Sequence, residues 1–364
     1  MRHRFHAICP YFAMFPEQFA EQWIDKLTDE GDLVFDPFCG RGTTPFQAIL
    51  MGRRALAADI NPVAFCITTA KTRAPVLSTL KRRLTHLEDG YSARRWTPRS
   101  SAQPVFFQRA YSTGTLAQLL YLRESLAWSR TRTDAMVAAL VLGALHGDTE
   151  TSPSYLSAQM PRTISTKPAY SIRFWEERDL HPPSRDVFAL LRRQAAFRYV
   201  SRPPDRRADV MLSDFRDLPR LPTVTEKSVS CIVTSPPYLD VTNFEEDQWL
   251  RLWFLGGPPH PTSGRVSNDD RHTNASSYWK MVADFWRMAG YILKPDGHVV
   301  IRMAGKGLSE HNVVQGLLGC AVLSGREVEL VSQATSTVRR RQTGAFRPGT
   351  TGVRFEVDAH FRVA

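Results

Sequence analysis

The 364-residue chain has few cysteines, and their spacing gives them no structural or metal-binding pattern. The five cysteines lie far apart and none forms a CxxC pair. This spacing argues against a disulfide framework and against a cysteine-rich zinc site. The ten histidines show no metal-binding spacing either. We therefore expect small buried thiols in a reducing compartment, and no bound metal.

Long apolar runs are also absent. No stretch approaches the ~20 residues that a membrane-spanning helix needs. The N-terminus carries basic residues, but Pro10, Pro16 and Glu17 interrupt any apolar core of the kind that signal peptides have. These observations predict a mature cytoplasmic sequence without a membrane segment.

Acidic residues are scarce in one segment only. Residues 71–207 contain 23 Lys and Arg against 11 Asp and Glu. The rest of the chain contains 24 Lys and Arg against 25 Asp and Glu. Positive charge concentrated in this way favours a polyanionic partner, most simply nucleic acid. A solvated, arginine-rich helical surface would give the same count, so charge alone leaves both interpretations open.

Strands and helices alternate in two parts of the chain. Apolar runs at 32–36 and 53–60 are each followed by a helical pattern, which is typical of a parallel α/β sheet. Further strands are predicted over 208–214, 228–234 and 294–305, and an antiparallel pair over 326–341 and 350–363. We predict an α/β protein with one doubly wound, mostly parallel, seven-stranded sheet. Residues 1–71 and 208–364 would form it, and residues 72–207 would be a basic, mainly helical insertion.

The sequence has no GxGxxG fingerprint and no phosphate-loop lysine, which disfavours dinucleotide and nucleoside triphosphate sites. Instead, DPFCGRGTT (36–44) follows the first strand. Its glycines let the backbone approach a ligand, and its strand-end carboxylate suits a cationic amino group. A turn that merely needs glycine is the alternative. The candidate ligand-binding residues here are Asp36, Phe38, Gly40, Gly42, Thr43 and Thr44.

Carboxylates also follow the second and third predicted strands. Asp59 comes about 20 residues after the glycines, where a carboxylate can accept hydrogen bonds from ribose hydroxyls. Ile60 and Asn61 join it as candidates, and a helix-capping role is the alternative. Asp214 and Phe215 suit a purine, the carboxylate taking an amino N–H and the ring packing on the base. An ordinary loop aspartate is the alternative for Asp214.

TSPPY (234–238) directly follows the fourth predicted strand. Together with DPFCGRGTT and the strand-end Asp59, it resembles the amino-group DNA methyltransferases that use S-adenosylmethionine. PYFAMFPEQF (10–19) resembles the family's entry to the cofactor-binding helix, which adds Phe15 as a candidate. The resemblance covers residues 5–70 and 209–305, not the basic middle segment.

The resemblance implies a Rossmann-like methyltransferase fold, S-adenosyl-L-methionine as cofactor and double-stranded DNA as substrate. It implies that the Ser235 side chain and the Pro236 carbonyl accept hydrogen bonds from an exocyclic amine. Pro236 and Pro237 fix the backbone, and Tyr238 stacks on a base rotated out of the duplex. Family members with serine at this position mostly methylate cytosine N4, and those with Asp or Asn mostly adenine N6. A cytosine-C5 enzyme needs a Pro-Cys loop, whereas Cys231 lies within the predicted strand.

The basic insertion is the predicted target-recognition region. The alternative is that the insertion is mainly scaffold or a dimer surface. In that case, DNA would be contacted by Arg251, Arg265, Arg271 and the run Arg339–Arg341. Three other functions stay open: an N6-adenine enzyme, an RNA amino methyltransferase and a catalytically silent DNA-binding protein. The implied setting is the bacterial or archaeal cytoplasm, associated with the nucleoid. A separate cognate restriction endonuclease and a homodimer are compatible with it.

Overall fold

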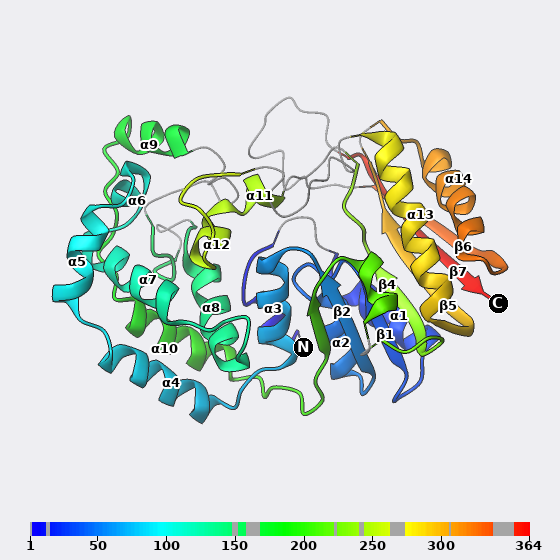
Figure 1. The fold of residues 1–364 in the computed structure, drawn as a ribbon, viewed down its shortest axis with the longest axis horizontal. Coiled ribbons are helices and arrows are strands. Elements are labelled where there is room, and N and C mark those ends of the chain that lie inside the picture. Colours follow the sequence, from blue (N-terminus) through cyan, green and yellow to red (C-terminus); the bar gives the residue numbers. More distant parts are fainter. Residues whose placement is uncertain are drawn as a thin grey trace. The chain divides into compact units, whose positions relative to one another are not determined.

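The chain forms two compact units. The computed structural model describes residues 2–11, 15–147, 152–157, 168–221, 224–239, 244–262, 274–305, 307–337 and 353–364. The sheet unit comprises Tyr11–Thr68, Pro204–Thr242 and Gly264–Ala364, and the helical unit comprises Met1–Pro10, Thr69–Pro203 and Asn243–Ser263 (Figure 1). The helical unit thus contains most of the predicted insertion, with the first ten residues and the segment after TSPPY added to it.

The sheet unit contains one seven-stranded sheet with the strand order β3-β2-β1-β4-β5-β7-β6. Its strands are β1 (Leu33–Asp36), β2 (Arg54–Asp59), β3 (Asp209–Leu212), β4 (Val229–Thr234), β5 (Leu293–Met303), β6 (Val328–Thr337) and β7 (Phe355–Val363). The first five strands pair in parallel, and β7 runs antiparallel to both β5 and β6. This topology confirms the predicted Rossmann-like methyltransferase fold.

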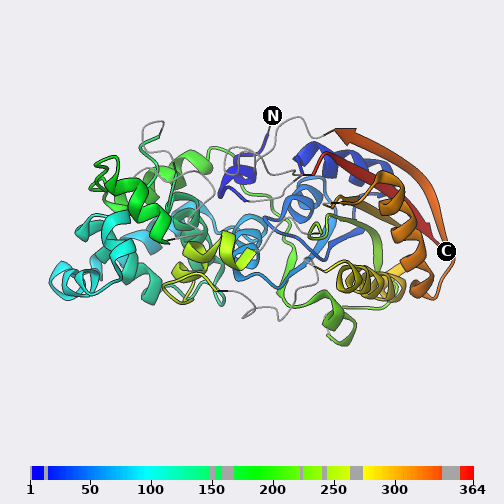
Figure 2. The ribbon, with the colours of Figure 1, turned by 90° about the horizontal axis from the view of Figure 1, so that it is seen from above.

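Helices cover both faces of the sheet (Figure 2). On β7, the His360 ring lies 5.1 Å from Trp23 of α1 (Glu17–Leu27), and the Phe361 ring lies 5.2 Å from Trp286 of α13 (Ala275–Ile292). Because neighbouring residues of a strand point to opposite faces, α1 and α13 lie on opposite sides. The short helix α2 (Thr43–Leu50) contacts α1, while α14 (Glu310–Ala321), η2 (Phe215–Arg220) and η4 (Val322–Ser324) contact α13.

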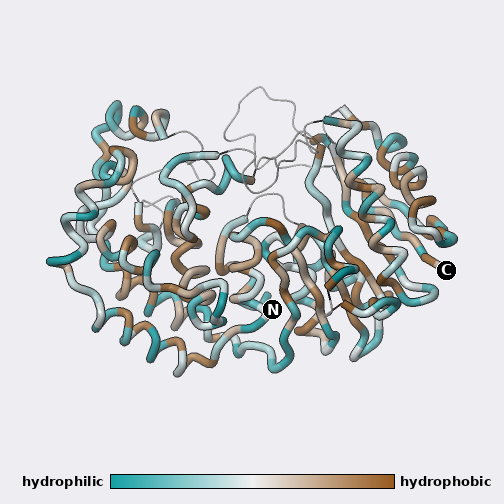
Figure 3. The backbone as a smooth tube through the Cα atoms, in the orientation of Figure 1, coloured by the Kyte–Doolittle hydropathy of each residue, from teal (hydrophilic) through white to brown (hydrophobic). Residues whose placement is uncertain are grey.

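The central strands are buried on both faces, so their sequences are almost continuously apolar. Val34 and Phe35 of β1, and Val229, Ile232 and Val233 of β4, are completely buried. In Figure 3, hydrophobic residues are concentrated along the strands of the sheet. This burial explains why short apolar runs identified these strands in the sequence.

The helical unit is built around α8 (Arg132–Ala144), which is buried at almost every position from Asp134 onward. Trp249 and Trp253 are each 2% exposed and pack on Phe107, so they belong to the core of this unit. The other described helices of the helical unit are η1 (Arg4–Ala7), α4 (Leu77–Asp89), α5 (Ala93–Ser101), α6 (Val105–Ala110), α7 (Thr113–Ser125), α9 (Pro168–Glu176), α10 (Val187–Arg198), α11 (Phe244–Asp247) and α12 (Trp249–Phe254). The chain enters this unit along α3 (Pro62–Thr72). Among the described residues, none of the helices has the length and apolar character that crossing a membrane requires.

Candidate active site

DPFCGRGTT and TSPPY lie side by side because the strands that lead into them, β1 and β4, are parallel neighbours. Val34 of β1 pairs with Cys231 of β4. The chain order reverses between these strands, and in open α/β sheets ligands bind outside the strand ends at such a point. Two hydrogen bonds join the motifs. Thr234 Oγ1 donates to Asp36 Oδ1 at 2.6 Å, and Thr44 Oγ1 donates to the Val233 carbonyl at 3.0 Å.

The glycine loop turns sharply between β1 and α2. Gly40 and Gly42 have φ values of +49° and +71°, which favour glycine. A Cβ atom at Gly42 would lie 2.6 Å from Thr68 Oγ1, so this position also lacks space for a side chain. Thr43 accepts a 3.3 Å hydrogen bond from Nε of the buried Arg41. The hydroxyls of Thr43 and Thr44 therefore hold the loop together, and their predicted cofactor contacts stay predictions.

Tyr11 covers this loop, although sequence reasoning did not select it. A Cβ at Gly40 would lie 3.4 Å from the Tyr11 ring, and the Tyr11 hydroxyl accepts a 2.9 Å hydrogen bond from Asn61 Nδ2. Tyr11 belongs to PYFAMFPEQF, in which only Phe15 was chosen. Phe15 is buried and packs edge-on against Phe19.

The carboxyl groups at the ends of β1 and β2 both have raised pKa values. Burial raises the pKa of Asp36 to about 7, although hydrogen bonds from the Thr234 hydroxyl and the Phe38 N–H act in the opposite direction. Burial likewise raises the pKa of Asp59 to about 6, against hydrogen bonds from the Asn61 and Gly40 N–H groups. A cationic or hydroxyl-bearing ligand would favour the ionised form of either group.

Asp59 connects β2 to the glycine loop. Its Oδ2 accepts from Gly40 N and its Oδ1 from Asn61 N, each at 2.9 Å. Asn61 Oδ1 in turn accepts from Val63 N, so Asn61 caps the start of α3. Ile60 is half-buried between them. The carboxylate is thus at the predicted strand end, and its ribose contacts stay a prediction.

Asp214 caps η2 and is bound to Arg216. Its carboxylate accepts hydrogen bonds from the Arg216 backbone N–H at 3.0 Å and from Nε at 2.9 Å, and it also pairs with Nη2. A purine amino group would therefore have to share this carboxylate with Arg216. No pattern in the sequence indicated that ion pair.

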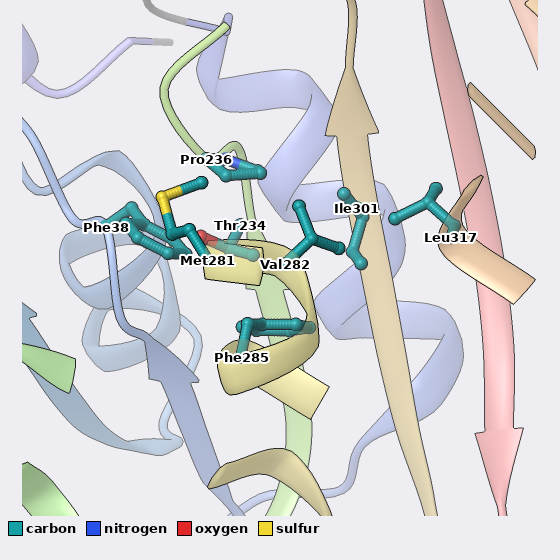
Figure 4. Close-up of a pocket in the computed structure, with 8 residues that line it drawn as sticks. All are labelled: Phe38, Thr234, Pro236, Met281, Val282, Phe285, Ile301 and Leu317. Carbon is teal, nitrogen blue, oxygen red and sulfur yellow. The ribbon is translucent and has the colours of Figure 1, made fainter. Parts of the chain in front are cut away.

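Two aromatic residues from separate motifs come together. The Phe215 ring lies 4.9 Å from Phe38, and Phe285 of α13 lies 6.2 Å from Phe38. Beside them is a small apolar pocket (Figure 4), in which Phe38 and Met281 lie close to Pro236. The pocket is lined by Phe38, Thr234, Pro236, Met281, Val282, Phe285, Ile301 and Leu317. An apolar, aromatic wall next to strand-end carboxylates suits a ligand that combines a flat ring with polar groups.

In the SPPY loop, Ser235 and Tyr238 are half-buried, Pro236 is buried and Pro237 is exposed. The Tyr238 hydroxyl donates a 2.9 Å hydrogen bond to Glu356 Oε1 on β7. Burial, and then the negative charge of Glu356, raise the pKa of this phenol. Leu239 forms a parallel bridge with Gly305, so the loop is held against the end of β5.

Cys231 does not present a nucleophile at this site. It is completely buried within β4, and burial raises the pKa of its thiol. A thiolate attack on a pyrimidine ring, the chemistry of cytosine-C5 transfer, therefore has no group here to perform it.

The strand order and the arrangement of the strand-end loops define a Rossmann-like methyltransferase fold, the fold class whose methyl donor is S-adenosyl-L-methionine. The residues present fit this cofactor: Asp36 and Asp59 suit its amino group and ribose hydroxyls, and Phe38 with Phe215 suits its purine. When bound, its sulfonium supplies an electrophilic methyl group.

Comparison with known proteins agrees with this class. Residues 3–69 match the family model of the N6/N4-type DNA methylases. The match confirms the predicted resemblance to amino-group DNA methyltransferases, and it lies over the N-terminal part of the chain.

Parts of this chain match three curated proteins that are named as methyltransferases. The type II methyltransferase M.MjaII of Methanocaldococcus jannaschii is 34% identical over 77 residues, 21% of this chain and 14% of that one. The orphan methyltransferase M.BamHII of Bacillus amyloliquefaciens is 47% identical over 49 residues, 14% of this chain and 18% of that one. The type II methyltransferase M.MvaI of Kocuria varians is 33% identical over 100 residues, 27% of this chain and 21% of that one. The chain thus spans about a fifth or less of the length of these relatives.

The solved structures that align with this chain include a SAM-dependent methyltransferase from Methanosarcina mazei. It aligns with a TM-score of 0.39 and 8% identity, over 96% of this chain and 98% of that one. TrmN from Thermus thermophilus aligns with a TM-score of 0.38 and 12% identity, over 99% of this chain and 52% of that one.

Proposed function

We propose that the protein transfers a methyl group from S-adenosyl-L-methionine to the exocyclic N4 of cytosine in double-stranded DNA, after the base has rotated out of the duplex. The observation that carries this proposal is the position of the SPPY loop directly after β4, whose last residues are hydrogen-bonded to Asp36 and Thr44 of DPFCGRGTT. The site residues proposed to act are Ser235, Pro236, Pro237 and Tyr238.

The proposed role of the loop follows from the chemistry of the amine. Its lone pair is delocalised into the ring, so the nitrogen is a poor nucleophile. Acceptors for its two N–H groups, the Ser235 side chain and the Pro236 carbonyl, would help it pyramidalise. The prolines preset the direction of that carbonyl, and the Tyr238 ring would stack on the base. Alignment then supplies much of the rate enhancement.

Serine at position 235 supports cytosine N4 over adenine N6. Cys231 is buried and its pKa is raised, which supports amine rather than ring-carbon methylation. The match of residues 3–69 to a DNA methylase family model supports DNA as the substrate. Proposed with this role are a cytoplasmic, nucleoid-associated location, a separate cognate restriction endonuclease and a homodimer.

We also propose that the basic helical unit contacts the DNA. Its support is the charge of residues 71–207 and the exposure of basic side chains on α4 and α5. Arg251, which the alternative placed on the DNA, is 7% exposed and its Nε donates to the Leu142 carbonyl, so its position does not favour that role. Arg265, Arg271 and Arg339–Arg341 lie outside the described residues.

Identification of the methylated nucleoside tests this proposal. The protein is incubated with isotope-labelled S-adenosylmethionine and either unmodified genomic DNA or total RNA, and the digests are examined by mass spectrometry. We expect N4-methylcytosine from DNA. N6-methyladenine would overturn the base assignment, and label in RNA alone would overturn the substrate.

A Ser235→Ala variant separates an enzyme from a silent DNA-binding protein. Losing this acceptor is expected to reduce transfer on the order of 10²-fold, while DNA binding is retained. Unchanged transfer would contradict the role of Ser235, and absence of transfer by the unsubstituted protein would favour the silent DNA-binding protein.

A further inference from the structure

Glu356, near the start of β7, forms a hydrogen bond that reaches the SPPY loop. Its Oε1 accepts the Tyr238 hydroxyl at 2.9 Å. Tyr238 is the last residue of that loop, three positions after Ser235. A carboxylate on the sheet therefore holds the aromatic ring that would stack on the base.

The Glu356 carboxylate has a rigid support. Arg302 Nη1 lies 3.7 Å from Glu356 Oε2, and Arg302 donates to both oxygens of Asp358, at 2.6 Å from Nε and 2.7 Å from Nη2. Its guanidinium stacks on the Phe19 ring, 4.0 Å from the centroid, and the side chain is only 13% exposed. Planar two-point pairing of this kind restricts orientation as well as adding energy. Contacts with Asp358 of β7 and Phe19 of α1 thus hold the Arg302 side chain in place. Arg302 in turn pairs with the Glu356 carboxylate and restricts its position.

The hydrogen bond has a direction because a carboxylate only accepts hydrogen bonds. Tyr238 therefore uses its single hydroxyl proton on Glu356. This bond ties the hydroxyl end of the Tyr238 ring to β7, while the backbone of the SPPY loop holds the other end.

We infer that Glu356 is a positioning residue for methyl transfer, an inference that rests on the proposed function. By accepting the Tyr238 hydroxyl, it holds the Tyr238 ring in the orientation in which that ring would stack on the base. Without Glu356, the ring loses this tether and the base is held less firmly against the methyl donor. Glu356 acts through Tyr238 and does not touch the substrate.

Steady-state methylation of unmodified genomic DNA with labelled S-adenosylmethionine tests this inference in the full chain. We expect Glu356→Ala to lower kcat about 10-fold while the KM for the cofactor changes less than about twofold. Tyr238→Phe keeps the ring and is expected to give a similar loss. The double variant should lose no more kcat than either single variant, because both substitutions remove the same hydrogen bond between Tyr238 and Glu356.

Glu356→Gln supplies a conservative rescue because its amide oxygen can still accept from Tyr238. It is expected to recover most of the lost kcat, and it also serves as the test if Glu356→Ala folds poorly. Glu329→Ala is the matched control: Glu329 pairs with Arg362 across β6 and β7, its side chain is 57% exposed, and its removal should leave kcat unchanged.

Three results would overturn the inference. The first is an unchanged kcat in Glu356→Ala. The second is a double variant in which the kcat losses of Glu356→Ala and Tyr238→Phe multiply. The third is a Glu356→Gln variant that has unaltered thermal stability and still does not recover kcat. All three leave the proposed function intact. Absence of transfer by the unsubstituted chain would instead overturn the proposed function, and this inference with it.

Discussion

Asp36 is a buried carboxyl group whose protonation depends on folding. Burial raises its pKa from an ordinary 3.8 to about 7. The folded state therefore holds this proton more tightly than the unfolded state. The contribution of this proton to the stability of the folded state is complete below about pH 4. It is lost as the pH rises through 7.

Replacement of Asp36 by asparagine should remove this pH-dependent loss. We expect Asp36→Asn to be more stable than the unsubstituted protein at pH 8, on the order of 1–4 kcal/mol, and nearly equal to it near pH 4. Calorimetric melting at both pH values measures the difference. Asp25→Asn, at an exposed position on α1, is the control. Equal melting temperatures at pH 8 would contradict the assigned burial effect.

Gly42 is the position of the glycine loop at which a side chain would be most costly. Gly42→Ala combines a φ of +71° with a Cβ 2.6 Å from Thr68 Oγ1, and we expect a loss of about 2–4 kcal/mol. Gly31 has a φ of +91° with no atom within 4 Å, so Gly31→Ala should cost only about 1 kcal/mol. Urea unfolding compares the two variants. Equal losses would show that strain alone, rather than the contact with Thr68, governs position 42.

The site residues found from sequence were those at strand ends. Asp36 and Asp59 were predictable because the carboxyl ends of parallel strands share one edge of a sheet. Tyr11 and Glu356 were not, because their partners are 50 and 118 positions away along the chain. Contacts over such separations depend on packing that no local pattern encodes.

At the scale of elements, the strands were the most predictable part. Parallel strands buried on both faces must be apolar, and β-branched runs between turns mark them. The fifth strand was predicted over 294–305 and extends over Leu293–Met303. The association of α11 and α12 with the helical unit was not predicted. It follows from burial of Trp249 and Trp253 against α6, a long-range contact without a sequence signature.

Asp134 in α8 provides a test of what stabilises the helical unit. Its carboxylate accepts from Arg83 Nε at 2.7 Å and from the Ala127 N–H at 2.9 Å, and only 6% of the side chain is exposed. Asp134→Ala leaves Arg83 without this partner and is expected to cost about 2–4 kcal/mol. Glu124→Ala removes the exposed pair with Arg99 and should cost less than about 1 kcal/mol.

Urea unfolding measures both losses, and titration with S-adenosylmethionine checks the sheet unit. Cofactor affinity should survive both substitutions because every residue proposed to bind the cofactor belongs to the sheet unit. A loss in Glu124→Ala as large as that in Asp134→Ala would contradict the role of burial.

At the scale of the whole molecule, the net charge of +11 makes salt the natural probe of DNA binding. The logarithm of the binding constant should fall linearly with the logarithm of salt concentration. Replacing the exposed Arg94 and Arg95 of α5 by alanine should reduce that slope by about 2 if both contact phosphates. Fluorescence anisotropy of a labelled duplex measures it.

Arg287→Ala, at an exposed position on α13, is the control and should leave the slope unchanged. An unchanged slope in the Arg94 and Arg95 variant would place α5 away from DNA. It would favour the interpretation of the helical unit as scaffold or dimer surface.

The SPPY loop is anchored at both ends. Thr234 ends β4 on one side, and on the other Leu239 bridges Gly305. Only four residues lie between these anchors, and two are prolines with fixed φ. Such a segment has little conformational entropy left to lose when a substrate arrives. In the proposed function, most of the free energy of substrate binding would then be available for extracting and holding the base, rather than for ordering the loop that receives it.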